Sequence, residues 1–233
     1  MKSAHKETYH SGNGFVLIPA FNESGMIARV IRQVGEHGFR VIVVDDGSTD
    51  DTAAIARANG AIVLSHLLNL GQGAALETGM TYLRTISSEW VIHFDADGQH
   101  DAHHISRMLA ALNEADVVLG SRFLAGAETP GMSIGRKRLL VLARIFQNLL
   151  TGVRLTDAHC GFRALNRKAL NLIRLRESGM AHATEIIVEI RRHDLKVKEV
   201  PVRIAYSDYS KAKGQSAFNA FQIIATLIQR KIL

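Results

Sequence analysis

Two closely spaced carboxylates mark the segment VIHFDADGQH, residues 91–100, as a place where the chain could do chemistry. Asp95 and Asp97 follow four mostly apolar residues, and a glycine, an amide and a histidine come after them. Carboxylates this close raise each other's pKa unless a positive charge lies between them. The pattern therefore favours a divalent cation beside Asp95 and Asp97.

Two other kinds of site use similar residues. Zinc would use the histidines, but their spacing fits neither a zinc finger nor the H-E-x-x-H motif. These histidines are His93, His100, His103 and His104. The segment VVDDGSTD, residues 43–50, would alone suit an aspartyl-phosphate site such as that of a receiver domain. That hypothesis leaves DADGQH unexplained, so the divalent cation has the better support.

The common nucleotide-binding loops are absent from the sequence. A dinucleotide site needs G-x-G-x-x-G after the first strand, where this chain has PAFNES, and the P-loop pattern G-x-x-x-x-G-K-[ST] does not occur. The segment NLGQGAALETG, residues 69–79, places glycines at the start of an expected helix. These glycines could approach a phosphate or could let the helix pack closely, and both roles stay open.

The composition is that of a globular protein. The chain has 233 residues, 47% of them hydrophobic and 21% charged, which is enough to bury a substantial core. A formal net charge of +6 suits a nucleotide or a phospholipid surface, although it could also serve solubility alone. The single cysteine, Cys160, excludes an internal disulfide and fits a reducing cytoplasm. Since we find neither a secretory signal nor an apolar run long enough to span a bilayer, we expect a soluble or peripheral protein.

In the first half of the chain, segments typical of strands alternate with segments typical of helices. The expected strands are residues 14–20, 39–50, 61–66 and 89–97, and the expected helices are 23–38, 51–60 and 71–86. Continuous apolar strands favour an α/β fold whose parallel sheet has helices on both faces. Ligands of such sheets bind beyond the carboxyl ends of the strands. Polar residues follow three of the strands there: Asn22 and Glu23, Asp45 and Asp46, and Asp95 and Asp97.

The second half of the chain is less regular. The expected helices are residues 103–115, 136–152 and 182–194, and the expected strands are 116–123 and 197–204. Pro201 indicates that the last strand lies at an edge of the sheet. Residues 124–135 are rich in glycine, which is typical of a mobile loop. We expect a flexible segment at 1–13, one globular domain at 14–215 and an amphipathic helix at 216–233.

Seven segments, taken in order, resemble the family 2 glycosyltransferases: IPAFNES, VVDDGSTDDT, NLGQGAALETG, DADGQH, GSRF, DAHCGFRAL and KGQS. The resemblance covers residues 14–216 and is strongest for enzymes similar to dolichyl-phosphate mannosyltransferase and the bacterial polyprenyl-phosphate glycosyltransferases. It implies a GT-A fold, which is an α/β fold with a mostly parallel central sheet. The implied reaction is transfer of a sugar from a UDP- or GDP-sugar to a polyprenyl phosphate, with Mg²⁺ or Mn²⁺ as cofactor.

The resemblance assigns the metal and the nucleotide to particular residues. It implies that Asp95, Asp97 and Gln99 bind the metal, since oxygen ligands suit Mg²⁺ and Mn²⁺. The metal would offset the charge that grows on the departing nucleoside diphosphate. Asp45 is expected to serve only the turn after its strand. The implied nucleotide-binding residues are Pro19, Phe21, Glu23, Val44, Asp46, Asp95, Ala96 and Lys211.

The acceptor and catalytic residues follow from the same resemblance. Arg122 and Arg136 match positions that bind the phosphate of the acceptor lipid, and guanidinium groups suit phosphate oxygens. A phosphate nucleophile is already anionic at neutral pH, so no strong base is required. The implied catalytic residues are Asp97, Arg122 and Asp157. For Asp157 and Glu185, a capping or core-polar role is an equal alternative to positioning the sugar or acceptor.

One segment departs from the family pattern. The family usually carries an arginine and a closing lysine near G-E-S-K, whereas this chain has YSKAKGQSAF with Lys211 and Ala217 at those positions. Lys213 could supply one of the two charges. How the diphosphate is held, and which base is preferred, therefore stays open. The sugar is also open among glucose, N-acetylglucosamine and mannose.

Other functions and partners fit parts of the sequence. A saccharide acceptor is one alternative to the lipid, and a non-catalytic nucleotide-sugar or lipid-binding module is another. We expect no nucleic-acid partner. The segment 216–233 has an apolar stripe with Arg230 and Lys231 near its tip, so it could attach the chain to the inner face of the cell membrane or to a small membrane protein. It could equally pack on the catalytic domain or form a homo-oligomer. The stripe is Phe218, Phe221, Ile224, Ala225, Ile228 and Ile232.

Overall fold

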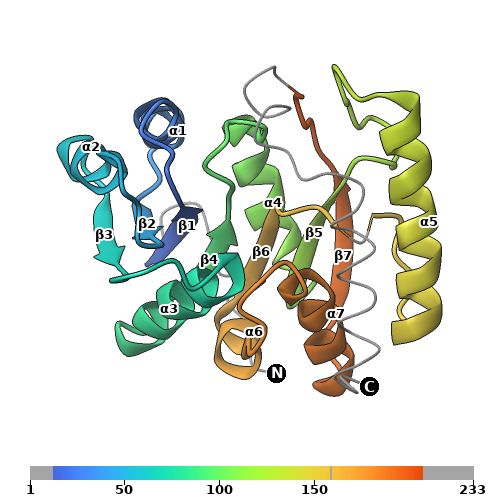
Figure 1. Ribbon diagram of the computed structural model, residues 1–233. Helices are drawn as coiled ribbons and strands as arrows, with labels where there is room; N and C mark the ends of the chain where they lie inside the picture. Colours follow the sequence, from blue (N-terminus) through green and yellow to red (C-terminus); the bar gives the residue numbers. More distant parts are fainter. Residues whose placement is uncertain (1–12, 158, 207–233) are drawn as a thin grey trace.

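A seven-stranded sheet organises residues 13–157 and 159–206, the part of the chain that the computed structural model describes (Figure 1). The strand order is β3-β2-β1-β4-β6-β5-β7. Only β6 runs antiparallel to its neighbours β4 and β5 in this sheet. The strands are β1 (Gly14–Ala20), β2 (Val41–Asp45), β3 (Ile62–Ser65), β4 (Trp90–His93), β5 (Val117–Ser121), β6 (Arg163–Asn166) and β7 (Val197–Pro201).

Helices lie on both faces of this sheet, as the continuous apolar strands predict (Figure 1). The mostly parallel α/β architecture is therefore confirmed, and β7 with Pro201 does lie at an edge. The helices are α1 (Ile27–Glu36), α2 (Thr52–Ala58), α3 (Gln72–Thr85), the short 3-10 helix η1 (Ala102–His104), α4 (Ile105–Ala111), α5 (Ile134–Thr151), α6 (Arg167–Leu172) and α7 (His182–Arg192).

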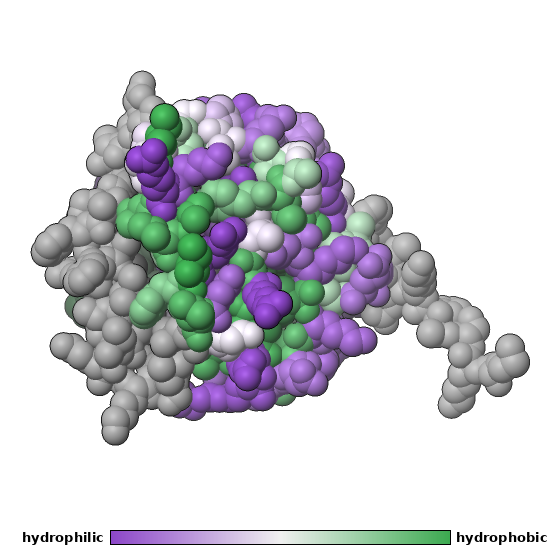
Figure 2. Space-filling view, turned by 90° about the vertical axis from the view of Figure 1, so that its right-hand side faces the viewer, coloured by the Kyte–Doolittle hydropathy of each residue, from purple (hydrophilic) through white to green (hydrophobic). Residues whose placement is uncertain are grey.

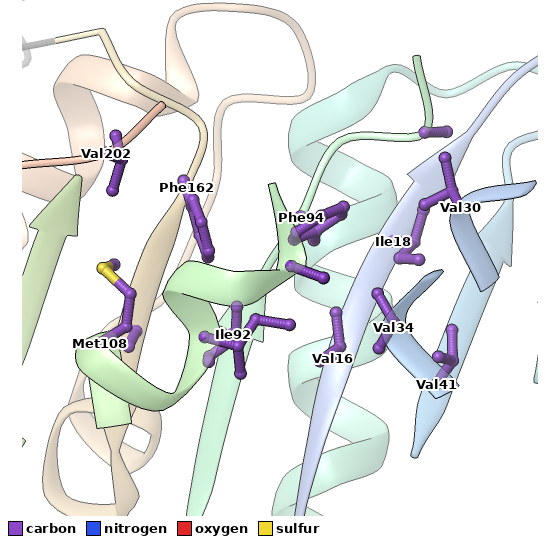
Figure 3. Close-up of a cluster of buried hydrophobic side chains, with 14 of the residues drawn as sticks. Val16, Ile18, Val30, Val34, Val41, Ile92, Phe94, Met108, Phe162 and Val202 are labelled. Atoms are coloured by element: carbon purple, nitrogen blue, oxygen red, sulfur yellow. The ribbon is translucent and has the colours of Figure 1, made fainter. Parts of the chain in front are cut away.

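Two hydrophobic layers sandwich the sheet because successive strand residues point to opposite faces. Val16 and Ile18 of β1 belong to the layer that α1, α2 and α4 cover (Figure 3). Phe15 and Leu17 belong to the other layer, which α3, α6 and α7 cover. A strand buried on both faces needs apolar residues at every position, and β1 is buried along its whole length.

The element that the sequence did not predict is β6, together with the short α6. β6 has only four residues, RALN, and its first residue is a fully buried arginine, Arg163. Such a segment has neither an apolar run nor an alternating pattern. β6 nevertheless occupies the middle of the sheet, with His93 of β4 opposite Arg163. Its antiparallel direction brings the start of β6 to the edge where β4 ends.

The carboxyl ends of β1, β2 and β4 meet at this same edge. Ala20 pairs with Asp45, and Leu17 pairs with His93, so the segments that follow the three strands leave the sheet together. The expected convergence of polar strand ends is a consequence of this register. Residues 122–133 form the loop expected between β5 and α5, without a helix or a named strand.

Candidate active site

Asp95 lies just beyond the end of β4, and three elements hold its carboxylate. Oδ2 is 2.7 Å from Nε2 of His100, and Oδ1 accepts a hydrogen bond of 3.2 Å from Nε2 of Gln72 at the start of α3. The backbone of Gly161 approaches so closely that a Cβ there would lie 2.4 Å from Oδ2. Gln72 and Gly161 were not among the predicted site residues, and His100 was named only as one of the histidines that zinc would use.

Asp97 is held by Gln99, which lies two residues later in the motif. Its Oδ1 accepts a bond of 3.0 Å from the backbone N–H of Gln99, and its Oδ2 accepts one of 2.6 Å from Nε2 of Gln99. Burial, together with the charges of Asp95 and Glu23, raises the pKa of Asp97 to about 6. Burial would also raise the pKa of Asp95, but His100 and Arg163 outweigh it and lower that pKa to about 2.

These properties match what a divalent cation requires. Carboxylate and amide oxygens are hard ligands, and the repulsion that raises the pKa of Asp97 would be relieved by a positive charge beside it. Within the described ranges 13–157 and 159–206, no group of three or more His, Cys, Asp or Glu side chains has a metal-binding arrangement. Asp95, Asp97 and Gln99 could thus supply part of a coordination shell that a diphosphate completes.

Asp46 is engaged within the protein through both of its oxygens. Oδ1 lies 2.7 Å from Nδ1 of His66 and accepts a bond of 2.9 Å from the N–H of Leu70, while Oδ2 accepts one of 2.7 Å from the N–H of Gly71. The carboxylate therefore fastens the loop between β3 and α3. A contact of Asp46 with a nucleotide remains a prediction.

The glycines at the start of α3 have a packing role. A Cβ at Gly71 would lie 2.5 Å from the carbonyl oxygen of Ser178, and one at Gly73 would lie 1.9 Å from that of Glu177. The N–H of Gly73 donates to the Ser178 carbonyl at 2.7 Å. The Ser178 carbonyl, which precedes α7, thus binds an N–H group at the start of α3. Phosphate binding was the other role expected for these glycines.

The remaining predicted nucleotide residues surround the same edge. Pro19 and Val44 are buried neighbours in β1 and β2, and Phe21 beyond β1 is 42% exposed, which leaves its ring open to a base. The backbone N–H of Glu23 donates to Oγ1 of Thr52 at 2.8 Å. Asp45 accepts from the N–H of Ser48, in keeping with its expected turn role. Ala96 is buried, and Lys211 and the other residues of the departing segment lie outside the described part of the chain.

Arg122 and Asp157 form a buried ion pair at the end of β5. Nε of Arg122 donates to Oδ2 at 2.6 Å, Nη2 donates to Oδ1 at 2.8 Å, and the backbone N–H adds a third bond of 3.0 Å. Burial would raise the pKa of Asp157, but Arg122 outweighs it and keeps that pKa below its usual range. Glu199 of β7 accepts bonds from the N–H groups of Thr156 and Asp157 and so fixes the loop.

Tyr206 joins the two arginines that were predicted to bind the acceptor phosphate. Its hydroxyl accepts a bond of 3.0 Å from Nη1 of Arg122, and Cζ of Arg136 lies 4.8 Å from the centre of its ring. Ser133 caps α5 by accepting from the backbone N–H of Arg136. The structure thus brings Arg122 and Arg136 to the side chain of Tyr206, which no sequence motif had singled out.

Glu185 is buried in the first turn of α7 and has the core-polar role, one of the expected alternatives to positioning the sugar or acceptor. Both of its oxygens accept bonds from backbone N–H groups of Arg176 and Glu177, at 2.9 to 3.0 Å. Glu185 therefore holds the segment that precedes α7. Its bonds run to this segment and not toward Asp95 or Arg122.

A buried group of basic side chains lies beneath Asp95. Arg163 and His93 face each other across β6 and β4, and Nη1 of Arg163 and both ring nitrogens of His93 have no hydrogen-bond partner among the described residues. Burial and the charge of Arg163 lower the pKa of His93 to about 3 and that of His182 to about 4. The permanent charge of Arg163 is thus a nearby counter-charge for Asp95.

Comparisons with known proteins identify the family of the chain. Residues 15–174 match the family described as Glycosyl transferase family 2. An uncharacterised protein of Methanocaldococcus jannaschii is 34% identical over 94% of this chain and 92% of its own length. The UDP-N-acetylglucosamine–dolichyl-phosphate N-acetylglucosaminyltransferase of Methanococcus voltae is 28% identical over 94% of this chain and 96% of its own. The undecaprenyl-phosphate mannosyltransferase of Micrococcus luteus is 25% identical over 84% and 85%.

A solved structure shares the fold. Glucosyl-3-phosphoglycerate synthase from Mycobacterium tuberculosis, crystallised with Mn²⁺, UDP and glucosyl-3-phosphoglycerate, superposes with a TM-score of 0.67 at 22% identity. The match covers 94% of this chain and 80% of the other. At this identity the likeness establishes the architecture alone.

Proposed function

Because the chain belongs to glycosyl transferase family 2 and has the GT-A fold, we propose that it transfers a sugar from a UDP- or GDP-sugar to a polyprenyl phosphate. The observation that carries the proposal is the separation of charge at the strand ends. Asp95 and Asp97 form an acidic group suited to a cation and its diphosphate, and Arg122 and Arg136 meet at Tyr206. The named relatives from Methanococcus voltae and Micrococcus luteus, both polyprenyl-phosphate glycosyltransferases, support this choice of acceptor.

On the donor side, Asp95, Asp97 and Gln99 would hold Mg²⁺ or Mn²⁺. The cation, when bound, supplies Lewis-acid stabilisation of the departing nucleoside diphosphate. Gln72 and His100 orient the Asp95 carboxylate for this role, and Gln99 orients that of Asp97. Phe21 would stack on the base, with Pro19, Glu23, Val44, Asp46, Ala96 and Lys211 as the other proposed nucleotide contacts.

On the acceptor side, Arg136 would bind the lipid phosphate. The positive charge of the more deeply buried Arg122 would add to the attraction of that phosphate. An oxygen of that phosphate attacks the anomeric carbon while the bond from this carbon to the diphosphate breaks. The attacking oxygen is already anionic at neutral pH, so the step needs no general base. Arg122, fixed by Asp157, would stay in place while the phosphate binds.

A saccharide acceptor is less well supported because of Asp157. A hydroxyl nucleophile needs a base to take its proton, and a useful base has a pKa near the working pH. Asp157 is bound to Arg122 through both oxygens and its pKa is lowered, so it would accept a proton poorly. An anionic phosphate acceptor avoids this requirement.

A panel of labelled donors tests the proposal. Purified protein is incubated with vesicles that contain polyprenyl phosphate and with labelled UDP-glucose, UDP-N-acetylglucosamine or GDP-mannose, with Mn²⁺ or with EDTA. We expect label in the lipid extract with one donor, and none with EDTA. Label that appears only in water-soluble saccharide would refute the lipid acceptor, and undiminished transfer in EDTA would refute the metal.

A further inference from the structure

Helix α5 is an apolar helix whose hydrophobic side chains are only half-buried or exposed in the part of the chain that the structure describes. Its 18 residues, IGRKRLLVLARIFQNLLT, are mostly hydrophobic, yet neither hydrophobic layer includes any of its described side chains. The buried residues of its described part are the polar Gln147 and Thr151. Gln147 accepts a bond from Thr184 of α7, which anchors the last turns of α5 to the domain.

The exposed apolar side chains of α5 share one side of the helix. Ile134 is 73% exposed, Leu142 64%, Ile145 46% and Leu149 80%. With Arg138 between the first two, these positions are spaced by three or four residues, which places them on one stripe. In Figure 1, α5 forms an outer wall of the molecule, and Figure 2 turns that side to the viewer and shows a band of hydrophobic residues among hydrophilic ones.

The charges of α5 are all positive. The helix carries Arg136, Lys137, Arg138 and Arg144 and no acidic residue. Among the described residues, none of these four cations forms an ion pair. Lys137 and Arg138 are exposed at the end of the helix where Arg136 contacts Tyr206. An apolar stripe with unpaired cations at one end is complementary to a surface that is apolar inside and anionic outside.

We infer that the α5 stripe (Ile134, Leu142, Ile145 and Leu149) rests on the surface of an anionic lipid bilayer. In that position Lys137 and Arg138 lie among headgroups, and Arg136 lies at the level where a lipid phosphate would enter. No helix in the described ranges is long and apolar enough to cross a membrane, so α5 would lie along the surface. The inference deepens the proposed function and rests on it for the link between this surface and the acceptor.

Charge favours anionic lipid over two other possible partners of the α5 stripe, a second copy of α5 and the segment 216–233. A second copy of α5 would bring further cations and no carboxylate to the stripe, and like charges at an interface are unfavourable. The segment 216–233 has no acidic residue either, and it adds Arg230 and Lys231. Anionic lipid is the occupant whose charge complements the helix.

A fluorescent label on α5 tests the inference in the full chain. Cys160 is the single cysteine and is buried, so a cysteine introduced on the surface can be labelled selectively. An environment-sensitive dye is placed on Leu142→Cys and on Leu149→Cys. The control is Leu67→Cys, because Leu67 is a fully exposed leucine (101%) away from α5. Vesicles contain phosphatidylglycerol with phosphatidylcholine, or phosphatidylcholine alone.

We expect the emission of both α5 labels to shift to the blue with the anionic vesicles and to stay unchanged with phosphatidylcholine alone. The label at position 67 should not respond to either. Arg138→Glu, combined with the label at 149, should weaken vesicle binding by about tenfold or more, since the reversal removes an attractive surface charge and adds a repulsive one. The same charge reversal at the exposed Arg29 of α1 should have little effect.

Other outcomes would overturn the inference. Blue-shifted emission without vesicles means that the protein covers the stripe: a second copy does so if the shift depends on protein concentration, and the chain's own segment does so if it does not. An equal response at position 67 means that α5 is not the contact surface. Since neither sugar nor acceptor is present, these results are independent of transfer. Transfer to a water-soluble short-chain prenyl phosphate tests the proposed function separately.

Discussion

Arg122 and Asp157 bind each other through two parallel hydrogen bonds in a part of the site that water barely reaches. Their side chains are 7% and 2% exposed, and the shortest contact, from Nε to Oδ2, is 2.6 Å. Two parallel hydrogen bonds fix the orientation of the guanidinium relative to the carboxylate, in addition to the attraction between their charges. The pair thus determines which groups of Arg122 face Tyr206 and how the loop after α5 joins the end of β5.

The first prediction concerns the stability of this pair. Asp157→Asn leaves the Arg122 charge buried without its partner, so the free energy of unfolding should fall by about 3 kcal/mol. Urea denaturation measures the change. As a control, Glu114→Gln removes the solvent-exposed ion pair with Lys198, which should cost less than about 1 kcal/mol. Equal losses in the two variants would contradict the assigned importance of the buried pair.

The second prediction separates the two contacts of Tyr206. Tyr206→Phe removes the hydroxyl that accepts from Arg122 but keeps the ring beneath Arg136, whereas Tyr206→Ala removes both. We expect Tyr206→Ala to raise the KM for the lipid acceptor by about tenfold and Tyr206→Phe by much less. The KM for the donor should stay the same in both variants. A tenfold change in the KM for the donor, with no change in that for the acceptor, would show that Tyr206 serves donor binding and would contradict its assignment to the acceptor.

The polar strand ends show what could be predicted from sequence. Asp45 and Asp95 follow runs of apolar residues, and parallel strands deliver their ends to one edge whatever the details of packing. The motif around Asp95, Asp97 and Gln99 is local, so its side chains meet through the turn they share. The resemblance to the family then added Arg122 and Arg136, which are distant from Asp95 in sequence.

Contacts between distant segments could not be predicted in this way. Tyr206 and Glu199 reach the site from the last strand and the residues after it, and neither stands in a recognisable motif. β6 could not be predicted because a four-residue strand that begins with a buried arginine has no periodic pattern. Asp46 shows the reverse case: its motif predicts a nucleotide contact, and the structure adds three bonds to the loop before α3.

The third prediction concerns the cation. Asp97→Asn removes a negative charge while keeping the shape of the side chain, and we expect transfer to fall by at least about a hundredfold because the leaving diphosphate loses stabilisation. The concentration of Mn²⁺ needed for half-maximal activity should rise as well. Asp101→Asn is the matched control, since Asp101 lies in the same segment but contacts His103. Full activity of Asp97→Asn in EDTA would refute a metal role for this residue.

The fourth prediction concerns pH. The pKa of His182 is about 4 in the folded protein, whereas an unperturbed histidine has a value of 6.5. Between these values the unfolded chain binds a proton that the folded chain does not, so stability is retained above pH 6.5 and lost as the pH falls toward 4. At pH 5 this single histidine costs about 2 kcal/mol.

Urea denaturation at pH 7 and pH 5 measures this effect. His182→Gln should lose less stability between the two pH values than the unaltered protein does. His37→Gln makes the same substitution at an exposed position at the end of α1 and serves as the control for the change of side chain. An identical pH dependence for His182→Gln and the unaltered protein would show that folding does not lower the pKa of His182.

The last prediction uses the glycine beside Asp95. A Cβ at Gly161 would lie 2.4 Å from Oδ2 and 2.9 Å from Oδ1 of Asp95, so Gly161→Ala must displace the carboxylate from His100. We expect transfer to fall by about tenfold to a hundredfold, since misplacement by an ångström can cost that much. Gly35→Ala is the matched control, because a Cβ there meets nothing within 4 Å. If Gly161→Ala retains full activity and its dependence on Mn²⁺ is unchanged, the position of the Asp95 carboxylate does not limit the reaction.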